Sequence, residues 1–130
     1  MKLNKKKYET LSNITEEKEF ELYGELIEYI EHSENINTLD IIECFSYIMN
    51  AYETVYHSKL NPHHAVMEEW LINNWDIDSI EMTEYITEIT VRLGFKKLYK
   101  RIKDLSRNNN LTQEVLLELQ DTVLEVGENL

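Results

Sequence analysis

Helical periodicity runs through nearly the whole chain, and few residues interrupt it. Only 3 Gly and 1 Pro occur among the 130 residues, which leaves few of the turns that a β-sheet needs. Apolar residues recur at steps of three and four over long stretches, and none of these stretches alternates with the period of two that is typical of a half-buried strand. We therefore predict an all-α fold: a compact bundle or short stack of five to six antiparallel helices in a single domain, residues 1–130.

The ends of the predicted helices are marked by residues that cap helices. We expect helices at about residues 15–32, 38–57, 62–73, 79–93, 95–105 and 113–126. The predicted N-terminal caps are Thr15, Asn37, Asn61 before Pro62, Asp78 at capping-box spacing from Glu81, and Thr112. Gly94 and Gly127 suit helix ends with a left-handed residue. Residues 1–13 fit either a flexible N-terminal arm or an extra turn of helix.

The second predicted helix has the widest apolar face. Ile41, Phe45 and Ile48 recur on it at steps of four and three, so we expect it to be central in the core. Cys44 is the only cysteine and falls on the same face, which predicts a buried side chain rather than a nucleophile. A lone cysteine fits a reducing compartment, and no apolar segment follows the basic N-terminus. We expect a cytoplasmic protein.

The formal net charge of −12 is unevenly distributed along the chain. Between Tyr8 and Val91 there are 19 acidic residues against 2 basic ones, a net charge of −17. Such a surface repels nucleic acid and anionic membranes, and it attracts a basic protein. We therefore expect a basic protein partner, no nucleic acid and no membrane.

Eleven of the 13 basic residues gather in two clusters. The first is Lys2, Lys5, Lys6 and Lys7, and the second is Arg92, Lys96, Lys97, Lys100, Arg101, Lys103 and Arg107. Five members of the second cluster, from Lys96 to Lys103, fall on the predicted helix 95–105. The negative charge of the chain argues against nucleic acid as their ligand, and they fit either a structural role, in which they neutralise acidic helices, or an interface for self-association.

Two predicted helices carry a row of carboxylates that no lysine interrupts. The first row is Glu21, Glu25 and Glu28, and the second is Glu81, Glu84 and Glu88, which follows Asp76 and Asp78. Like charges at this spacing destabilise a helix, and faces that only confer solubility normally mix both signs. We therefore predict that both rows, with Asp76 and Asp78, bind a partner, and the alternative is plain solvation.

Trp75 lies in a polar loop beside Asp76 and Asp78. A tryptophan with an acidic rim is typical of an interface anchor, so we count Trp75 among the predicted partner-binding residues. The alternative is that its indole ring folds back onto the core.

The sequence contains no catalytic motif. None of the four histidines follows a glutamate by three residues, so the di-iron motif of helical bundles is absent. His63, His64 and Glu68 offer metal-ligating groups from one helix, but exposed pairs of this kind are common. We expect no catalytic residues, no metal site and no cofactor.

Two segments resemble a known family. The stretch from Trp75 to Lys103, with Ile80-Glu81-Met82 and then Leu93-Gly94-Phe95-Lys96-Lys97-Leu98-Tyr99, is similar to small all-helical immunity proteins of bacterial polymorphic toxin systems, the type called immunity protein 30. The closing Glu125-Val126-Gly127-Glu128-Asn129 has a similar character. The resemblance implies an all-α fold, a cognate toxin as partner and no enzymatic activity. It implies no specific binding residue.

Three hypotheses on function follow. The first is an immunity-type inhibitor that binds a basic toxin domain, such as a nuclease, through an acidic helical face and blocks its active site. The second is a helical scaffold or regulatory module that oligomerises through apolar faces. The third is a phage-type inhibitor that mimics the charge of nucleic acid. The sequence does not distinguish a monomer from a homodimer.

Overall fold

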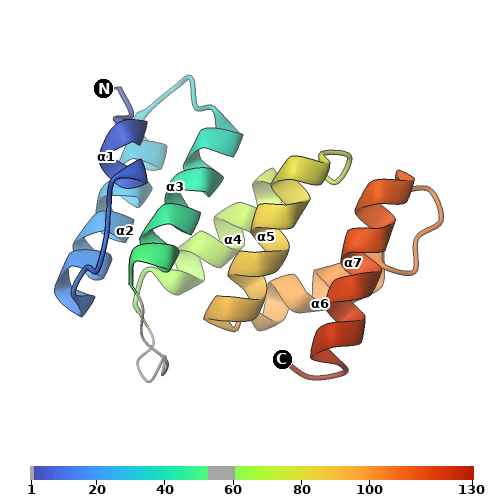
Figure 1. Cartoon of the computed structure of the whole chain (residues 1–130). Helices are drawn as coiled ribbons and strands as arrows, with labels where there is room; N and C mark the ends of the chain where they lie inside the picture. The colour runs from blue at the N-terminus through green and yellow to red at the C-terminus, as the bar shows by residue number, and fades with distance from the viewer. Residues whose placement is uncertain (1, 53–60) are drawn as a thin grey trace. The chain divides into compact units, whose positions relative to one another are not determined.

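The computed structural model describes residues 2–52 and 61–130, and in this part of the chain it contains seven α-helices and no strand (Figure 1). The helices are α1 (Lys5–Glu9), α2 (Glu16–His32), α3 (Thr38–Ala51), α4 (His64–Asn74), α5 (Ile80–Leu93), α6 (Lys96–Leu105) and α7 (Gln113–Val126). The prediction of an all-α fold is confirmed. The helix count exceeds five to six because the N-terminal arm forms α1. None of the described helices is both long and apolar enough to cross a bilayer.

The chain forms two compact units, Met1–Met67 and Glu68–Leu130. The boundary falls inside α4, and each unit is described by itself below. The prediction of a single domain over residues 1–130 stays a prediction.

The predicted caps of the two long helices in unit 1 are confirmed. The Thr15 hydroxyl accepts the N–H of Lys18 at 3.1 Å, and the Asn37 amide oxygen accepts the N–H of Asp40 at 3.1 Å. These bonds satisfy backbone donors that the first turn of each helix leaves unpaired. Helix α3 ends earlier than predicted, at Ala51, and residues 53–57 of the predicted helix lie outside the described residues.

Two other helix starts differ from the predictions, and one predicted cap makes no hydrogen bond. Asn61 accepts the N–H of His63 at 2.9 Å in a turn, so α4 begins at His64 rather than at Pro62. The cap of α5 is Ser79, whose hydroxyl accepts the N–H of Met82 at 3.2 Å, and not Asp78. Thr112 precedes α7 as predicted, but its side chain makes no capping hydrogen bond.

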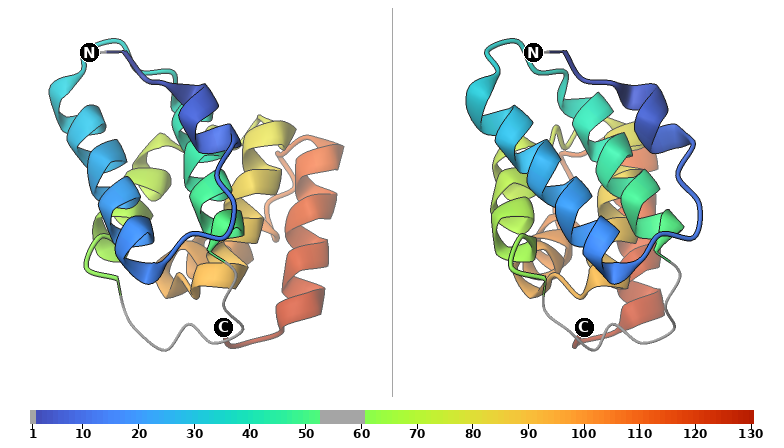
Figure 2. Two further views of the ribbon diagram at one scale, coloured as in Figure 1. Left: turned by 60° about the vertical axis from the view of Figure 1, so that its left-hand side comes forward. Right: turned by 90° about the vertical axis from the view of Figure 1, so that its left-hand side faces the viewer.

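Unit 1 is built around α3, against which both α1 and α2 pack; α2 and α3 run in opposite directions (Figure 2). Leu22, Tyr23 and Leu26 of α2 are fully buried, as are Ile41, Ile42, Cys44, Phe45 and Ile48 of α3. The prediction that Cys44 is a buried side chain is confirmed, and its burial raises the pKa of the thiol to about 12.

An ion pair holds α1 to α3. Lys5 Nζ lies 2.6 Å from Glu43 Oε2 and 3.2 Å from Asp40 Oδ1, and Glu43 is nearly buried. The hydrogen bond to Glu43 raises the pKa of Lys5 above its usual range, against the opposite effect of burial. A buried carboxylate needs such a partner, because an unpaired charge in the core is costly.

Phe20 lies on α2, and its ring is half exposed. It packs against the His63 ring, with 4.5 Å between ring centroids. A Cβ atom at Gly24 would lie only 3.1 Å from His63 Nε2, so a larger residue there would require a small shift of the His63 ring. The contact with Phe20 gives His63 a packing role.

In unit 2, the three helices α5, α6 and α7 pack against one another. The buried side chains include Ile86, Ile89, Leu98, Ile102, Val115 and Leu119. Helices α5 and α7 run in the same direction, with α6 between them in the sequence (Figure 1). The predicted antiparallel arrangement therefore does not describe this pair.

The junction of α5 and α6 depends on two residues. Gly94 has a φ of 69°, in the left-handed region that glycine adopts without strain, and it ends α5 as predicted. Phe95 precedes α6 but provides no side-chain cap. Glu68 of α4 provides the cap instead, because its Oε2 accepts the N–H groups of Lys97 and Leu98 at 3.0 and 3.1 Å.

We predict that Glu68→Ala lowers the free energy of unfolding by about 1–2 kcal/mol, because the positive end of the α6 dipole loses its anionic cap. Glu69→Ala, at the exposed neighbouring position, is the matched control and should change stability by less than about 0.5 kcal/mol. Urea unfolding followed by circular dichroism measures both. Equal losses in the two variants would show that Glu68 does not stabilise α6.

Burial makes the charge of Glu19 unfavourable in the folded state. Burial raises the pKa of the Glu19 carboxyl, a hydrogen bond with Asn61 lowers it, and the charge of Glu16 raises it, with a net upward shift. The folded chain therefore holds this proton to a higher pH than the unfolded chain does. This group's contribution to stability falls as pH rises from its ordinary pKa of 4.5 through its folded pKa.

We predict that Glu19→Gln raises the free energy of unfolding at pH 7, because glutamine carries no charge to bury. The gain should vanish below about pH 4, where Glu19 is protonated in both states. Urea titrations at a series of pH values measure the difference. Glu17→Gln, at an exposed position of α2, is the control. A gain that does not depend on pH would contradict this explanation.

Candidate functional site

An acidic groove lies between α5 and α7 in unit 2. It has a volume of about 430 Å³ and is lined by Glu84, Thr87, Glu88, Val91 and Arg92 of α5 and by Glu118, Thr122 and Glu125 of α7. Four carboxylates and one guanidinium thus surround it. We call this set of eight residues the acidic groove.

The periodicity of α5 places its carboxylates on the outside. Met82, Ile86 and Ile89 are buried at steps of four and three. Glu81, Glu84 and Glu88 occupy the opposite side and are all exposed. Because the apolar stripe determines which face turns inward, the acidic row has to face solvent.

One polar contact, between Thr87 and Glu118, joins the two walls of the groove. Thr87 Oγ1 lies 2.9 Å from Glu118 Oε1 and 3.1 Å from the backbone oxygen of Glu84. Its single hydroxyl proton can be donated to one of these acceptors at a time. The Thr122 hydroxyl donates to the backbone oxygen of Glu118 at 2.8 Å. Glu118 is therefore held against α5.

The electrostatic balance of the groove is negative. Arg92 Nη1 lies 3.4 Å from Glu88 Oε1, a pair at i, i+4 with both side chains substantially exposed. Pairs of this kind contribute little to stability. Glu81 and Glu84 form no ion pair with any residue that the structure describes. The field of these carboxylates is thus available to a cationic partner.

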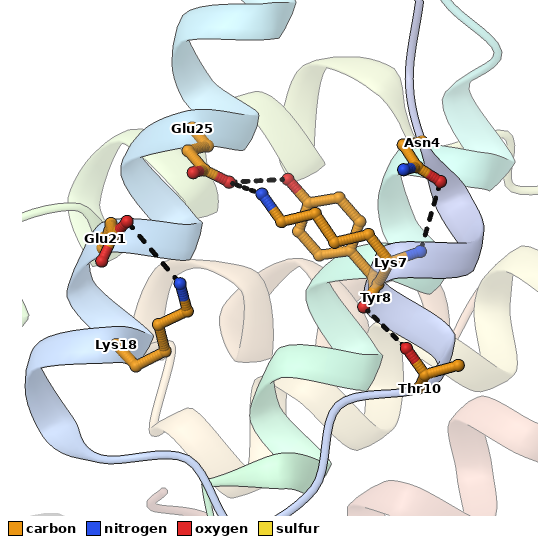
Figure 3. Close-up of polar contacts among 7 residues, drawn as sticks. All are labelled: Asn4, Lys7, Tyr8, Thr10, Lys18, Glu21 and Glu25. Atoms are coloured by element: carbon orange, nitrogen blue, oxygen red, sulfur yellow. Dashed lines mark hydrogen bonds and ion pairs between the residues drawn. The ribbon is translucent and has the colours of Figure 1, made fainter.

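The acidic row of α2 has a different environment, in unit 1. Lys7 Nζ lies 2.8 Å from Glu25 Oε2, and the Tyr8 hydroxyl donates to the same oxygen at 3.4 Å (Figure 3). Burial, together with the charge of Glu25, raises the pKa of Tyr8 above its usual range, so the phenol keeps its proton. Glu25 therefore links α1 to α2, and its role as a partner-binding residue stays a prediction.

Glu21 and Glu28 flank this contact on α2. Glu21 Oε1 lies 3.6 Å from Lys18 Nζ, and Glu28 lines a pocket of about 290 Å³ that also contains Lys2 and Lys7. Positive and negative groups are interleaved here, as they are on faces that confer solubility. The two acidic rows are therefore not equivalent, and the α5 row is the stronger candidate.

The structure buries Trp75, which is 9 % exposed. Its indole N–H donates to Thr83 Oγ1 at 3.0 Å, and the Thr83 hydroxyl in turn donates to the backbone oxygen of Ser79 at 2.7 Å. The indole ring folds onto α5, as the alternative interpretation proposed. We therefore withdraw Trp75 as an exposed interface anchor.

Asp76 and Asp78 are exposed at the start of α5. Asp76 Oδ1 accepts the N–H of Asp78 at 3.0 Å, and the Asp76 backbone oxygen accepts the N–H of Ser79. This turn leads the chain into the Ser79 cap. Asp76, Asp78 and Glu81 extend the negative surface beyond the N-terminal end of the groove, but they do not line it.

Glu118 and Glu125 are absent from the predicted site. They are seven residues apart on α7, which places them on one side of the helix beside the buried Val115 and Leu119. Their spacing was visible in the sequence. Nothing in the sequence showed that α7 would pack against α5.

Two residues of the basic helix α6 have a structural role. The Tyr99 hydroxyl donates to the backbone oxygen of Gly127, and Lys103 Nζ donates to that of Glu128 at 3.0 Å. Lys103 also lies 5.3 Å from the centroid of the Tyr99 ring. Tyr99 and Lys103 thus hold the C-terminal segment, while Lys96, Lys97, Lys100 and Arg101 are exposed.

The structure also assigns roles to two of the proposed metal-ligating groups. Glu68 caps α6, and the His63 ring packs on Phe20. Within the described residues, no three His, Cys, Asp or Glu side chains come together in a group that could hold a metal ion.

Comparisons of this chain with protein-family models, with curated proteins and with solved structures find no match. The resemblance to immunity proteins stays a prediction.

We predict that Trp75→Phe lowers the free energy of unfolding by about 1–2 kcal/mol, because it removes a buried hydrogen bond and leaves a small void. The folded variant should bind a partner of the acidic groove with unchanged affinity. Urea unfolding and a binding titration measure the two effects. Lost affinity at unchanged stability would restore Trp75 as a direct partner contact.

Proposed function

We propose that this chain is an immunity-type inhibitor that binds a basic protein domain through the acidic groove and blocks the domain's active site. The observation that carries the proposal is the convergence of four carboxylates, from two helices, on a groove with one guanidinium. Surfaces of one sign speed the arrival of an oppositely charged protein and exclude partners of like charge.

A nuclease toxin domain suits this chemistry. Its active site and substrate channel are lined with cationic groups that bind phosphates. The carboxylates of the acidic groove would take the place of those phosphates and exclude the substrate. A compact bundle or short stack of helices, the architecture that we propose for the whole chain, would hold the carboxylates in fixed positions. The inhibitor would need no catalytic residue and no cofactor, and it would act in the cytoplasm on a toxin present there.

The resemblance of residues 75–103 to immunity proteins supports this proposal, because α5 and most of α6 lie in that stretch. A phage-type inhibitor that mimics nucleic acid charge would use the same surface against a different basic target.

A scaffold that oligomerises is the second candidate function. It is favoured by the exposure of Leu117 and Leu124 on α7. Light scattering distinguishes the two functions, because an oligomer formed through apolar contacts persists at high salt, whereas a complex held by the acidic groove weakens.

The decisive experiment is to change Glu81, Glu84 and Glu88 together to Lys. Where a neighbouring gene encodes a toxin domain, that domain is the binding partner to use. We expect the triple variant to bind it at least about 100-fold more weakly, because attraction becomes repulsion at three positions. Calorimetry measures the affinity, and circular dichroism checks that helical content survives.

The matched control changes Glu31, Glu34 and Glu69 to Lys. These residues are also exposed and lie outside the groove, and the net charge changes by the same amount. We expect this variant to bind nearly as well as the original chain. Equal losses of affinity in the two triple variants would show that net charge alone, and not the acidic groove, determines binding. A neighbouring metabolic enzyme in place of a toxin would argue against an immunity role.

A further inference from the structure

Helix α7 carries one five-residue pattern twice. The pattern has an acidic residue at its first position, an aliphatic residue at its third, Leu at its fourth and Glu at its fifth. Its two copies are Glu114-Val115-Leu116-Leu117-Glu118 and Asp121-Thr122-Val123-Leu124-Glu125. The second copy follows the first by seven residues. Since seven residues make about two helical turns, each residue lies nearly in line with its counterpart along the helix. The repeat therefore creates rows of equivalent side chains on α7.

Three of these rows follow one another around the helix. At about 100° per residue, the order from the buried side of Val115 and Leu119 is first Glu118 with Glu125, then Glu114 with Asp121, then Leu117 with Leu124. The burial agrees with this order. The first row lines the acidic groove, whereas Glu114 and Asp121 are exposed. Leu117 is 48 % exposed and Leu124 is 83 % exposed.

The leucine row is the part of α7 that packing within unit 2 does not explain. A single exposed leucine is ordinary on a protein surface. Two leucines in line, bordered on one side by two rows of carboxylates, form a face with an apolar stripe and a charged margin. Such a face is suited to an amphipathic helix that lies alongside it.

The charge of α7 indicates which kind of helix can bind to this face. The helix contains Glu114, Glu118, Asp121 and Glu125, and it has no Lys, Arg or His. A second copy of α7 would bring like charges together, which disfavours a homodimer through this face. A basic partner helix gains attraction from the same carboxylates, and its aliphatic side chains can cover Leu117 and Leu124.

We propose that the outer face of α7, defined by Leu117, Leu124, Glu114 and Asp121, binds a basic amphipathic helix of the partner. The aliphatic residues of that helix would repeat every seven positions, with Lys or Arg beside them on one flank. The inference rests on the proposed function and specifies which segment of the basic partner is recognised. The acidic rows attract and orient the segment, and the leucine row supplies apolar contact that salt does not screen.

The test uses two synthetic peptides of about three heptads each. One carries Leu at a fixed heptad position with Lys beside it, and the other has the same composition in scrambled order. Fluorescence anisotropy measures their affinities for the full chain at about 50 mM salt. We expect the amphipathic peptide to bind at least about tenfold more tightly than the scrambled one.

Changing both Leu117 and Leu124 to Ser should lower the affinity for the amphipathic peptide about tenfold and leave that for the scrambled peptide unchanged. Val66→Ser is the matched control, because Val66 is 47 % exposed and lies outside α7. It should alter neither affinity. Circular dichroism verifies folding, and Leu124→Gln, which keeps a good helix former, replaces the double variant if that one unfolds.

Several results would overturn the inference. One is equal affinity for the two peptides, and another is unchanged binding by the leucine variant. A third is a dimer in light scattering that the leucine variant abolishes. Suppose that both peptides bind with equal affinity and that neither binds once Glu81, Glu84 and Glu88 are changed to Lys. This result would support the acidic groove as the binding surface and would contradict the proposal for the α7 face. If neither the glutamate changes nor the leucine changes alter the affinity for either peptide, both proposals are contradicted.

Discussion

The packing of α7 against α5 is the contact on which the functional surface depends. Val115 and Leu119 are buried on one side of α7, and Met82, Ile86 and Ile89 are buried on one side of α5. Once these apolar stripes face inward, the period of the helix leaves no freedom in the placement of the remaining residues. Glu118 has to lie beside Thr87, with which it forms a hydrogen bond. Carboxylates that are 30 to 41 residues apart in the sequence thereby share one groove.

The chain's lysines have different consequences in the two units. In unit 1, Lys5 and Lys7 of the short helix α1 pair with carboxylates of α3 and α2, namely Asp40, Glu43 and Glu25, and these three stabilise the unit itself. In unit 2, Lys103 of α6 binds a backbone oxygen of the C-terminal segment. Within the described residues, Glu88 is the only α5 carboxylate that forms an ion pair, and its partner is Arg92. The net charge of −12 therefore does not show that carboxylates are paired differently in the two units. This difference depends on the tertiary contacts.

Features that depend on neighbours along the chain were predictable from the sequence. The apolar periods of α5, α6 and α7 predicted these helices nearly to the residue, and Thr15, Asn37 and Gly94 act as their positions suggested. Features that depend on distant residues were not predictable. No local pattern indicates that Glu25 pairs with Lys7, that Glu68 caps α6, or that Trp75 reaches Thr83. The sequence prediction also named Asp78 as the cap of α5, whereas the cap is Ser79. Both residue types cap helices, so the local sequence does not distinguish two neighbouring candidates.

The two proposals for unit 2 assign different tasks to adjacent rows of a single helix. Charges exposed to solvent act over about 8 Å at physiological salt, so they guide a partner before contact and raise the association rate. Apolar contacts act only once the surfaces touch, and they mainly slow dissociation. An inhibitor of a toxin needs both properties, because it has to find its target quickly and to remain bound. In the two proposals, the row of Glu118 and Glu125 on α7 would meet the first need and the row of Leu117 and Leu124 would meet the second. The row of Glu114 and Asp121 lies between them, where a lysine of the partner can contact carboxylate and leucine together.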